Sequence, residues 1–447
     1  MPPFIRSRLL PGIFLLMRTA GPVLAAEAAR IESRSYSTRP DPDPPAYVKP
    51  GSVDPDGNFD FGLDYRWRFE ARDDDLRRAA AGSDSPQLHR LRAYFGLKEV
   101  LDPFRFALEI QDSRKSAGAY PVDGRDVNET EIIRGYVELR GPGVSGARYG
   151  IHNFEFLDRR LIGNNQWRNT ANTFDGLHAY AEGRDSVWRA DLLSVRPLER
   201  LPAEQDEPVA GQRLHALIGQ FRPPSLPTAV IQPYWLRLVD DSRPGGRRVD
   251  SPGVRAYGDI SGTDWDYDLS FTLQRGHDGA SSVRAHAFTA EAGWRARDSW
   301  DSRIGLFFGC ATGDDNPADS HSGRFEKFFG FGRPWSASDY VVNENILTPK
   351  LRWEARPSAA LRFDLGWSSY WLESAADRFY GGGLQDATGA SGSHLGDEID
   401  FRLRWTPDAR IQVTFGYSHF MCGEFVRRQT GRQDTDFTYL ELQLSAF

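Results

Sequence analysis

The sequence predicts an all-β protein, a transmembrane, antiparallel, up-and-down β-barrel of about eighteen strands. Three observations predict this class. Apolar and polar residues alternate one by one along most of the 447 residues, as in a strand with one apolar and one polar face. No apolar run beyond the N-terminus reaches the ~18 residues of a membrane-spanning helix. The connections between alternating segments are short and long in turn, which is typical of outer-membrane barrels.

The N-terminus has the features of a secretory signal. Arg6 and Arg8 precede an apolar run over residues 9–17, and the alanines within residues 25–28 offer cleavage sites. We therefore expect residues 1–28 to be a signal peptide, with a disordered tail as the alternative.

A change of composition separates the next segment from the barrel. Residues 29–57 are rich in Pro, Asp and Ser and have little apolar surface to bury, so we expect a flexible periplasmic segment. The alternation then begins and continues to the C-terminus, where the apolar residues of 399–405 and 411–417 interleave with polar ones. The barrel should therefore occupy residues 58–447.

The connections form two sets. Short turns are predicted at residues 99–102, 141–146, 183–185, 222–228, 261–263, 295–299, 356–359 and 406–409. Longer loops are predicted at residues 71–86, 113–129, 155–171, 196–210, 240–249, 276–283, 311–343, 373–394 and 422–434. The short turns should face the periplasm and the long loops the cell exterior. Pro233 interrupts one of the weaker predicted strands, because proline removes a ladder hydrogen bond.

Composition narrows the functional classes. The net charge of -7 argues against a nucleic-acid partner. Cys310 and Cys422 have no histidines at zinc spacing, so we expect neither a metal site nor a cofactor. The apolar faces could contact lipid or form the core of a soluble β-protein. The loop pattern favours lipid, and hence the bacterial outer membrane, because soluble sandwiches have no reason to keep it.

If the apolar rows face lipid, the polar rows line a lumen. Many of these polar positions are arginines, namely Arg66, Arg68, Arg90, Arg92, Arg134, Arg352, Arg362, Arg402 and Arg404. Rings of arginine select for anions in a narrow pore. The alternative is that they are ordinary lumen charges, balanced by aspartates of the same phase such as Asp266, Asp268 and Asp400.

Counting back from the turns gives an expected register for two hairpins. It places Arg352 opposite Asp364, a complementary pair. In the C-terminal hairpin it places Arg402 opposite Thr414, and it leaves both Arg402 and Arg404 without a charge partner in their own hairpin. These two arginines are therefore the first candidates for an anion path.

Three short motifs together resemble a signature of the alginate export family of outer-membrane porins. They are Asp158-Arg159-Arg160-Leu161-Ile162-Gly163, Trp167-Arg168-Asn169 and Thr173-Phe174-Asp175-Gly176. In the family, the residues that precede this signature usually include an Arg-Gln pair after a glycine. At the matching place this chain has Gly150-Ile151-His152-Asn153, so that arginine is missing. The strand count and the long loop before residue 343 match the family along nearly the whole mature chain.

This resemblance implies a monomeric outer-membrane barrel with an arginine-rich constriction that passes a polyuronate chain. It also implies partners in a periplasmic export scaffold. On the same basis, Arg160 and Arg168 join the pore-lining candidates.

Four functions compete. The first is passive export of an anionic, alginate-like polysaccharide through an anion-selective lumen. The second is an uptake porin for small acidic sugars. The third is an outer-membrane hydrolase, for which Ser418 and His419 are the nearest pairing, although adjacent strand residues point to opposite faces. The fourth is a soluble carbohydrate-binding β-protein. We favour the first, with no catalytic residues and with membrane lipid and an anionic polysaccharide as partners.

Overall fold

Eighteen long strands close into one antiparallel β-barrel, which confirms the predicted fold class. The structure is a computed structural model and describes residues 33–34, 58–183, 186–316, 318–332 and 335–446. The predicted signal peptide and nearly all of the predicted periplasmic segment lie outside the described residues. The described residues between 33 and 446 belong to one compact structural unit.

The barrel strands follow one another along the chain. They are β1 (Phe59–Asp73), β3 (Gln87–Leu101), β4 (Phe104–Ser116), β5 (Asn128–Arg140), β6 (Val144–His152), β7 (Phe174–Glu182), β8 (Trp188–Glu199), β10 (Gln212–Phe221), β11 (Ala229–Asp240), β12 (Arg247–Asp259), β13 (Trp265–Asp278), β14 (Ser281–Arg295), β15 (Arg303–Ala311), β17 (Ile346–Ser358), β18 (Leu361–Trp371), β19 (His394–Asp408), β20 (Ile411–Cys422) and β21 (Asp434–Ser445).

The described parts of the loops between the barrel strands contain five short elements. They are the two-residue strands β2 (Ser83–Asp84), β9 (Glu207–Pro208) and β16 (His321–Ser322), the 3-10 turn η1 (Leu157–Arg159) and the helix α1 (Glu424–Thr430). Within the described part of the chain, no helix has the length and apolar character needed to cross a membrane.

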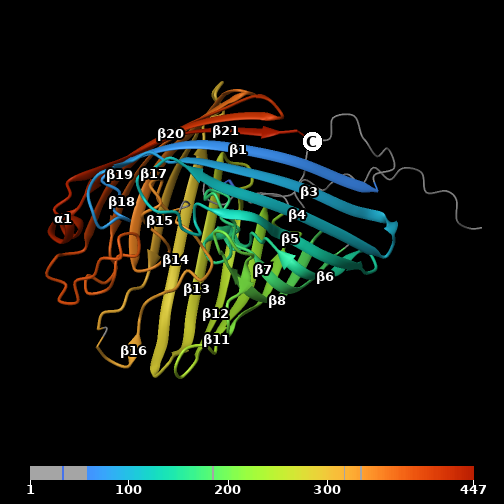
Figure 1. Cartoon of the computed structure of the whole chain (residues 1–447), viewed down its shortest axis with the longest axis horizontal. Helices are drawn as coiled ribbons and strands as arrows, with labels where there is room; N and C mark the ends of the chain where they lie inside the picture. The colour runs from blue at the N-terminus through green and yellow to red at the C-terminus, as the bar shows by residue number, and fades with distance from the viewer. Residues whose placement is uncertain (1–32, 35–57, 184–185, 317, 333–334, 447) are drawn as a thin grey trace, which may run out of the picture. The chain divides into compact units, whose positions relative to one another are not determined.

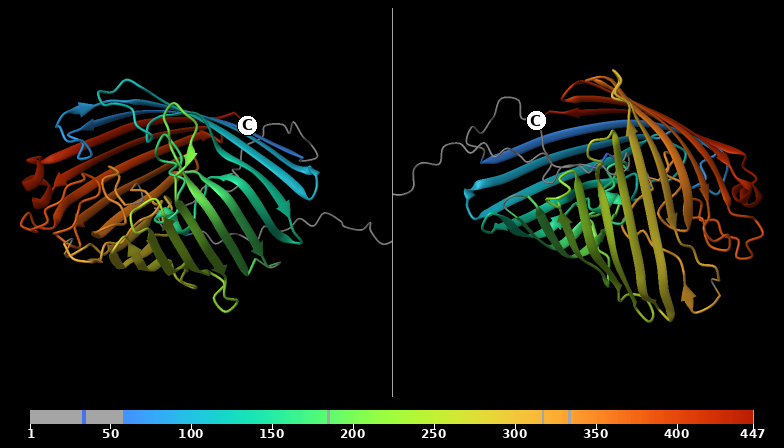
Figure 2. Two further views of the ribbon diagram at one scale, coloured as in Figure 1. Left: turned by 60° about the horizontal axis from the view of Figure 1, so that its bottom comes forward. Right: turned by 180° about the vertical axis from the view of Figure 1, so that it is seen from behind.

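The first and last strands close the barrel. β1 pairs with β3 on one side and with β21 on the other, as Figure 1 shows by the blue strand lying beside the red one. The long loops and α1 lie at one end of the barrel, and the short turns and the C-terminus lie at the other (Figures 1 and 2). This arrangement agrees with the predicted separation of short turns and long loops.

Burial alternates along the strands and identifies their two faces. Leu91, Leu217 and Leu306 are 43%, 52% and 58% exposed, whereas Arg66 and Arg90 are 2% and 4% exposed. The apolar row therefore faces outward, where lipid covers it, and the polar row faces the lumen.

The strands around Pro233 form as predicted. Pro233 lies within β11, opposite Val254 of β12. The pairing of β11 with β10 is interrupted between the Ile218–Tyr234 and Phe221–Ile231 pairs. Proline has no N–H group to donate, so the ladder loses a bond at this point without losing the strand.

The register between β17 and β18 differs from the prediction. Arg352 lies opposite Gly366 rather than Asp364. The main reason is the position of the turn, which lies at residues 359–360 rather than at 356–359. An irregularity between Ala355 and Ser358 then shifts the pairing back by one residue.

The register between β19 and β20 differs in the same way. Arg402 lies opposite Gly416 rather than Thr414, because the turn lies at residues 409–410 rather than at 406–409. An irregularity between Trp405 and Asp408 shifts the pairing back by one residue. Both predicted registers were therefore wrong by two residues. An even shift keeps each side chain on its face, so the arginines still face the lumen.

Two of the long loops fold into the barrel instead of standing outside it. They are the β6–β7 loop (residues 153–173) and the β15–β17 loop (residues 312–345). The backbone N–H of Phe329 donates to the Leu161 carbonyl at 2.9 Å, which joins one loop to the other. Trp335 reaches the wall, where its carbonyl accepts a bond from the Tyr370 hydroxyl at 2.9 Å. The buried apolar residues of both loops form a core inside the lumen, which the sequence pattern did not predict.

Candidate functional site

Four arginines form a cluster on the lumen face of β1 and β3. Arg66 and Arg68 are each 2% exposed, and Arg90 and Arg92 are 4% and 7% exposed. The ladder places Arg66 directly opposite Arg90. The period-two alternation of both strands sends these side chains to one face, so the sequence concentrates positive charge on one patch of wall. These four residues are called the arginine cluster below.

Backbone and side-chain oxygens of the β6–β7 loop cover the arginine cluster. Arg66 donates to the carbonyls of Gln166 and Arg168, each at 2.8 Å. Arg90 donates to the same Gln166 carbonyl at 3.1 Å, and Arg92 donates to the Gln166 side-chain oxygen at 2.7 Å. A neutral loop segment therefore satisfies much of the hydrogen-bonding capacity of the four guanidiniums.

Carboxylates neutralise only part of the cluster. Glu441 lies 3.7 Å from Arg66 and 3.4 Å from Arg68, and Arg68 also contacts Glu70 at 2.9 Å. Within the described residues, neither Arg90 nor Arg92 forms a salt bridge. Asp64 lies opposite Arg92 in the ladder and is also buried, but it forms no salt bridge with either arginine within the described residues. The two guanidiniums are therefore only partly compensated, in a region that water reaches poorly and where charges interact strongly.

Asn169 fixes the loop on the cluster. Its side-chain amide donates to the carbonyls of His89, Arg114 and Asp126 at 3.0, 3.1 and 2.8 Å. Its side-chain oxygen accepts a bond from Arg66 at 3.2 Å. Asn169 is 1% exposed, so these bonds are protected from water. Sequence reasoning found Asn169 only through the family motif, because its partners lie far away along the chain.

The two arginines suggested by the family resemblance lie on this same loop. Arg168 pairs with Asp339 of the β15–β17 loop at 3.0 Å. Arg160 pairs with Asp158, and its guanidinium lies 5.3 Å from the Phe307 ring and 5.4 Å from the Trp335 ring. Arg168 therefore joins the two inward loops, and Arg160 contacts both the β15–β17 loop and the barrel wall at β15.

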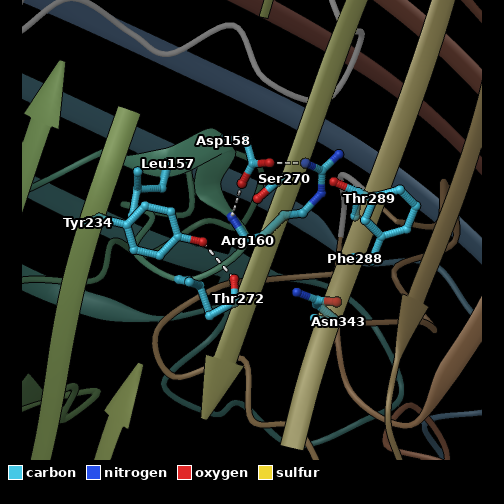
Figure 3. Close-up of a pocket in the computed structure, with 11 residues that line it drawn as sticks. Leu157, Asp158, Arg160, Tyr234, Ser270, Thr272, Phe288, Thr289 and Asn343 are labelled. Carbon is cyan, nitrogen blue, oxygen red and sulfur yellow. Dashed lines mark hydrogen bonds and ion pairs between the residues drawn. The ribbon is translucent and has the colours of Figure 1, made fainter. Parts of the chain in front are cut away.

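Arg160 also borders a small cavity of about 10 Å³ (Figure 3). Tyr234, Thr272 and Asn343 line the cavity as well, and the Tyr234 and Thr272 hydroxyls are 2.6 Å apart. The space suits roughly one water molecule. The backbone next to Arg160 is strained, because Leu157, Asp158 and Arg159 have positive φ angles of 52°, 60° and 65°.

The wall formed by β17, β18 and β19 carries paired charges. Arg352 binds Asp364 at 2.7 Å and Asp400 at 3.0 Å, and Arg402 binds Asp364 at 3.0 Å. Arg402, the first candidate from the sequence, thus has a carboxylate partner on the neighbouring strand β18. On this wall Arg352 and Arg402 are therefore ordinary lumen charges that aspartates balance, which was the alternative to an anion-selective ring.

The remaining candidates lie elsewhere on the lumen face. Arg134 of β5 pairs with Glu109 of β4 at 3.2 Å. Arg362 of β18 lies directly opposite Arg404 of β19, and both are partly buried. The structure thus gathers Arg66, Arg68, Arg90 and Arg92 on the β1–β3 wall, and Arg352, Arg362, Arg402 and Arg404 around the carboxylates of the β17–β19 wall.

Ser418 and His419, the nearest pairing for a hydrolase, lie on opposite faces of β20. The Ser418 hydroxyl lies 2.7 Å from the Ser338 hydroxyl inside the barrel, whereas His419 contacts Asp436 at 3.0 Å on the other face. The two side chains therefore do not form a catalytic pair. Among the residues that the structure describes, no group of His, Cys, Asp and Glu side chains could hold a metal ion.

Comparison with known proteins places this geometry in a family. The sequence profile described as Alginate export matches residues 58–439. No sequence among the curated proteins compared matches the chain.

Solved outer-membrane proteins of Pseudomonas aeruginosa share the fold. OpdK has a TM-score of 0.61 at 13% identity, covering 86% of this chain and 98% of its own. OccK2 (OpdF), solved in complex with glucuronate, has a TM-score of 0.61 at 14% identity, covering 87% of this chain and 99% of its own. OccK11 (OpdR) has a TM-score of 0.58 at 15% identity, covering 87% and 95%. The chain therefore belongs to the alginate export family and is a β-barrel channel of the bacterial outer membrane.

Proposed function

We propose that this channel conducts an anionic polysaccharide of the polyuronate class outward across the outer membrane. The observation that carries the proposal is the arginine cluster, in which Arg90 and Arg92 have no salt bridge within the described residues. Membership of the alginate export family supports the same substrate class. The remaining candidate arginines on the lumen face would offer further, weaker contacts along the path.

The mechanism is an exchange of hydrogen-bond acceptors. The guanidiniums of the arginine cluster now donate to neutral carbonyls of the β6–β7 loop. A uronate carboxylate is a stronger acceptor than a carbonyl, because a charge-assisted hydrogen bond is roughly twice as strong as a neutral one. Each carboxylate of the polymer would replace part of its hydration by guanidinium donors and then move to the next site. Many weak sites in series allow a chain to enter and also to leave.

A second candidate is uptake of small acidic sugars. Two observations favour it: one structural neighbour was solved in complex with glucuronate, and the two inward loops narrow the lumen. A periplasmic export scaffold would be a partner under the first proposal only.

The test is conduction through the purified barrel in planar bilayers. We expect a reversal potential that shows anion selectivity, and block by oligomers of mannuronate. A cation-selective channel that is indifferent to uronates would contradict both candidates.

Liposomes separate the two candidates. Vesicles containing the barrel are loaded with uronate oligomers of increasing length. Release of oligomers of many residues supports polymer conduction, whereas release of monosaccharides alone supports the uptake porin.

A further inference from the structure

A second charged site lies at the loop end of the barrel, next to the arginine cluster, with which it shares Arg68. It is a cavity of about 60 Å³, which is room for several water molecules. Its walls come from the end of β1, from the start of β3, and from the loops that follow β1, β4, β6 and β15. Six arginines and six carboxylates line it, so its formal charges cancel. The pairing of these groups shows which of them are available to a ligand.

Four of the six arginines are bound to carboxylates of the same cavity. Arg68 and Arg72 bind Glu70 at 2.9 and 3.2 Å, Arg77 binds Asp75 at 2.7 Å, and Arg168 binds Asp339 at 3.0 Å. Burial by itself would raise the pKa of Asp75, but the Arg77 and Arg72 guanidiniums lower it below its usual range. The Asp75–Arg77 pair is therefore ionised at neutral pH.

The other three carboxylates have donors of their own. Asp126 binds Lys115 at 3.3 Å, Asp84 accepts backbone N–H bonds from Ser85 and Ala119 at 3.0 and 2.6 Å, and Asp123 accepts the backbone N–H of Arg125 at 2.8 Å. Every lining carboxylate thus has a partner before the last two arginines are considered.

Those two arginines are Arg78 and Arg125. Neither forms a salt bridge with any residue that the structure describes. The Arg78 guanidinium lies 4.5 Å from the centre of the Tyr120 ring, and its Nε is buried without a hydrogen-bond partner. Arg125 is exposed, which places it where a ligand can enter from the outside. A cavity whose acids are satisfied and whose surplus donors are two guanidiniums suits an anion.

We propose that this cavity is a binding site for one carboxylate of an acidic sugar, held by Arg78 and Arg125 at the external mouth of the channel. The proposal rests on the proposed function for its substrate class. The fork of a guanidinium matches a planar carboxylate in a bidentate manner, and the Tyr120 ring holds Arg78 in position through a cation–π contact. In outward transport this would be the last site that the polymer leaves.

The test is isothermal titration of the purified, detergent-solubilised barrel with glucuronate, with glucose and inorganic phosphate as comparison ligands. We expect glucuronate to bind, glucose not to bind, and phosphate to bind more weakly than glucuronate. The double variant Arg78→Gln, Arg125→Gln should weaken glucuronate binding by roughly tenfold or more, as the loss of charge-assisted bonds predicts. As single variants, Arg78→Lys should bind glucuronate more tightly than Arg78→Gln and more weakly than the unchanged chain. Lysine keeps the positive charge but lacks the planar fork of the guanidinium.

Arg114→Gln is the matched control, because Arg114 lies at the same end of the barrel, is half exposed and binds Asp112 outside the cavity. It should bind glucuronate like the unchanged chain. Equal affinity of the double variant and the unchanged chain would overturn the proposal, and so would phosphate binding more tightly than glucuronate.

Bilayer recordings separate this proposal from the proposed function. Suppose that the unchanged chain is anion-selective, and that glucuronate added on the loop side reduces the current through the double variant as much as through the unchanged chain. The proposed external site is then wrong, and the proposed function stands. If the unchanged chain shows no anion selectivity, the proposed function fails, whatever the titration gives.

Discussion

Arg66 lies directly opposite Arg90 in the β1–β3 ladder, and both side chains are buried on the lumen face. Like charges that face each other across two strands destabilise a sheet. The Gln166 carbonyl accepts a hydrogen bond from each of them, at 2.8 and 3.1 Å, and so offsets part of this cost. A neutral acceptor does not cancel the two positive charges, so Arg66 and Arg90 can still attract a carboxylate.

Arg90→Gln should reduce anion selectivity without unfolding the barrel. The change removes one positive charge that has no salt bridge within the described residues, and glutamine can still donate to the Gln166 carbonyl. We expect the preference for anions to fall roughly fivefold, or by about 1 kcal/mol. This is the order of the interaction between one wall charge and an ion that passes it in a partly screened site. Reversal potentials in a salt gradient measure it.

Arg402→Gln is the matched comparison for Arg90→Gln. Arg402 binds Asp364 at 3.0 Å, so its charge is already compensated. Its loss should change selectivity less than the loss of Arg90. An equal or larger effect at Arg402 would show that the anion path runs along the β18–β19 wall, as the sequence alone suggested.

Asp364→Asn should move selectivity in the opposite direction. Asp364 is buried and binds both Arg352 and Arg402, so its neutralisation leaves more positive charge on that wall. We expect a stronger preference for anions and a loss of about 3 kcal/mol in the free energy of unfolding, as is typical when one partner of a buried ion pair is removed. Reversal potentials and the temperature of heat-modified gel migration report the two effects. Unchanged selectivity would mean that this wall lies away from the ion path.

Asn169→Ala should release the β6–β7 loop from the wall. The two N–H groups of the Asn169 amide donate to three carbonyls, so at least one N–H is shared, and a hydrogen bond of this kind is worth about 1 kcal/mol. We expect a larger and noisier single-channel conductance and faster proteolysis within residues 164–170. Asn316→Ala, in an exposed part of the β15–β17 loop, is the control and should change neither property. A quiet, unchanged Asn169→Ala channel would show that the loop does not limit conductance.

Leu217→Arg should destabilise the barrel in lipid. Leu217 is 52% exposed in the middle of β10, on the face assigned to lipid, and an arginine at the bilayer midplane costs ~2–4 kcal/mol. Leu226→Arg is the control, because Leu226 is 56% exposed in the turn between β10 and β11. Denaturant unfolding in vesicles should show a clear loss for the first variant and a loss below about 0.5 kcal/mol for the second. Equal losses would contradict the assignment of the outer face.

The lumen pairs show where prediction from the sequence stops. The period-two pattern predicted which residues of β17, β18 and β19 face the lumen, because alternation is a local property of the backbone. It did not predict that Arg402 binds Asp364, because that contact joins two hairpins and depends on their mutual register. Both turns lie later along the chain than predicted, at residues 359–360 and 409–410, and each hairpin contains an irregularity of one residue, so both predicted registers were wrong by two residues.

Local patterns in the chain were enough to predict the number of strands, the face of each strand and the separation of short turns from long loops. These features follow from alternation and from the spacing of turns, which act over a few residues. Only the tertiary structure decided that two long loops fold inward, that Gln166 and Asn169 cover the arginine cluster, and that Arg78 and Arg125 remain without salt bridges in the described part of the chain. Those outcomes depend on contacts between residues tens of positions or more apart, such as Asn169 with Asp126 and Arg66 with Gln166. No local pattern encodes which acceptor a buried guanidinium will find.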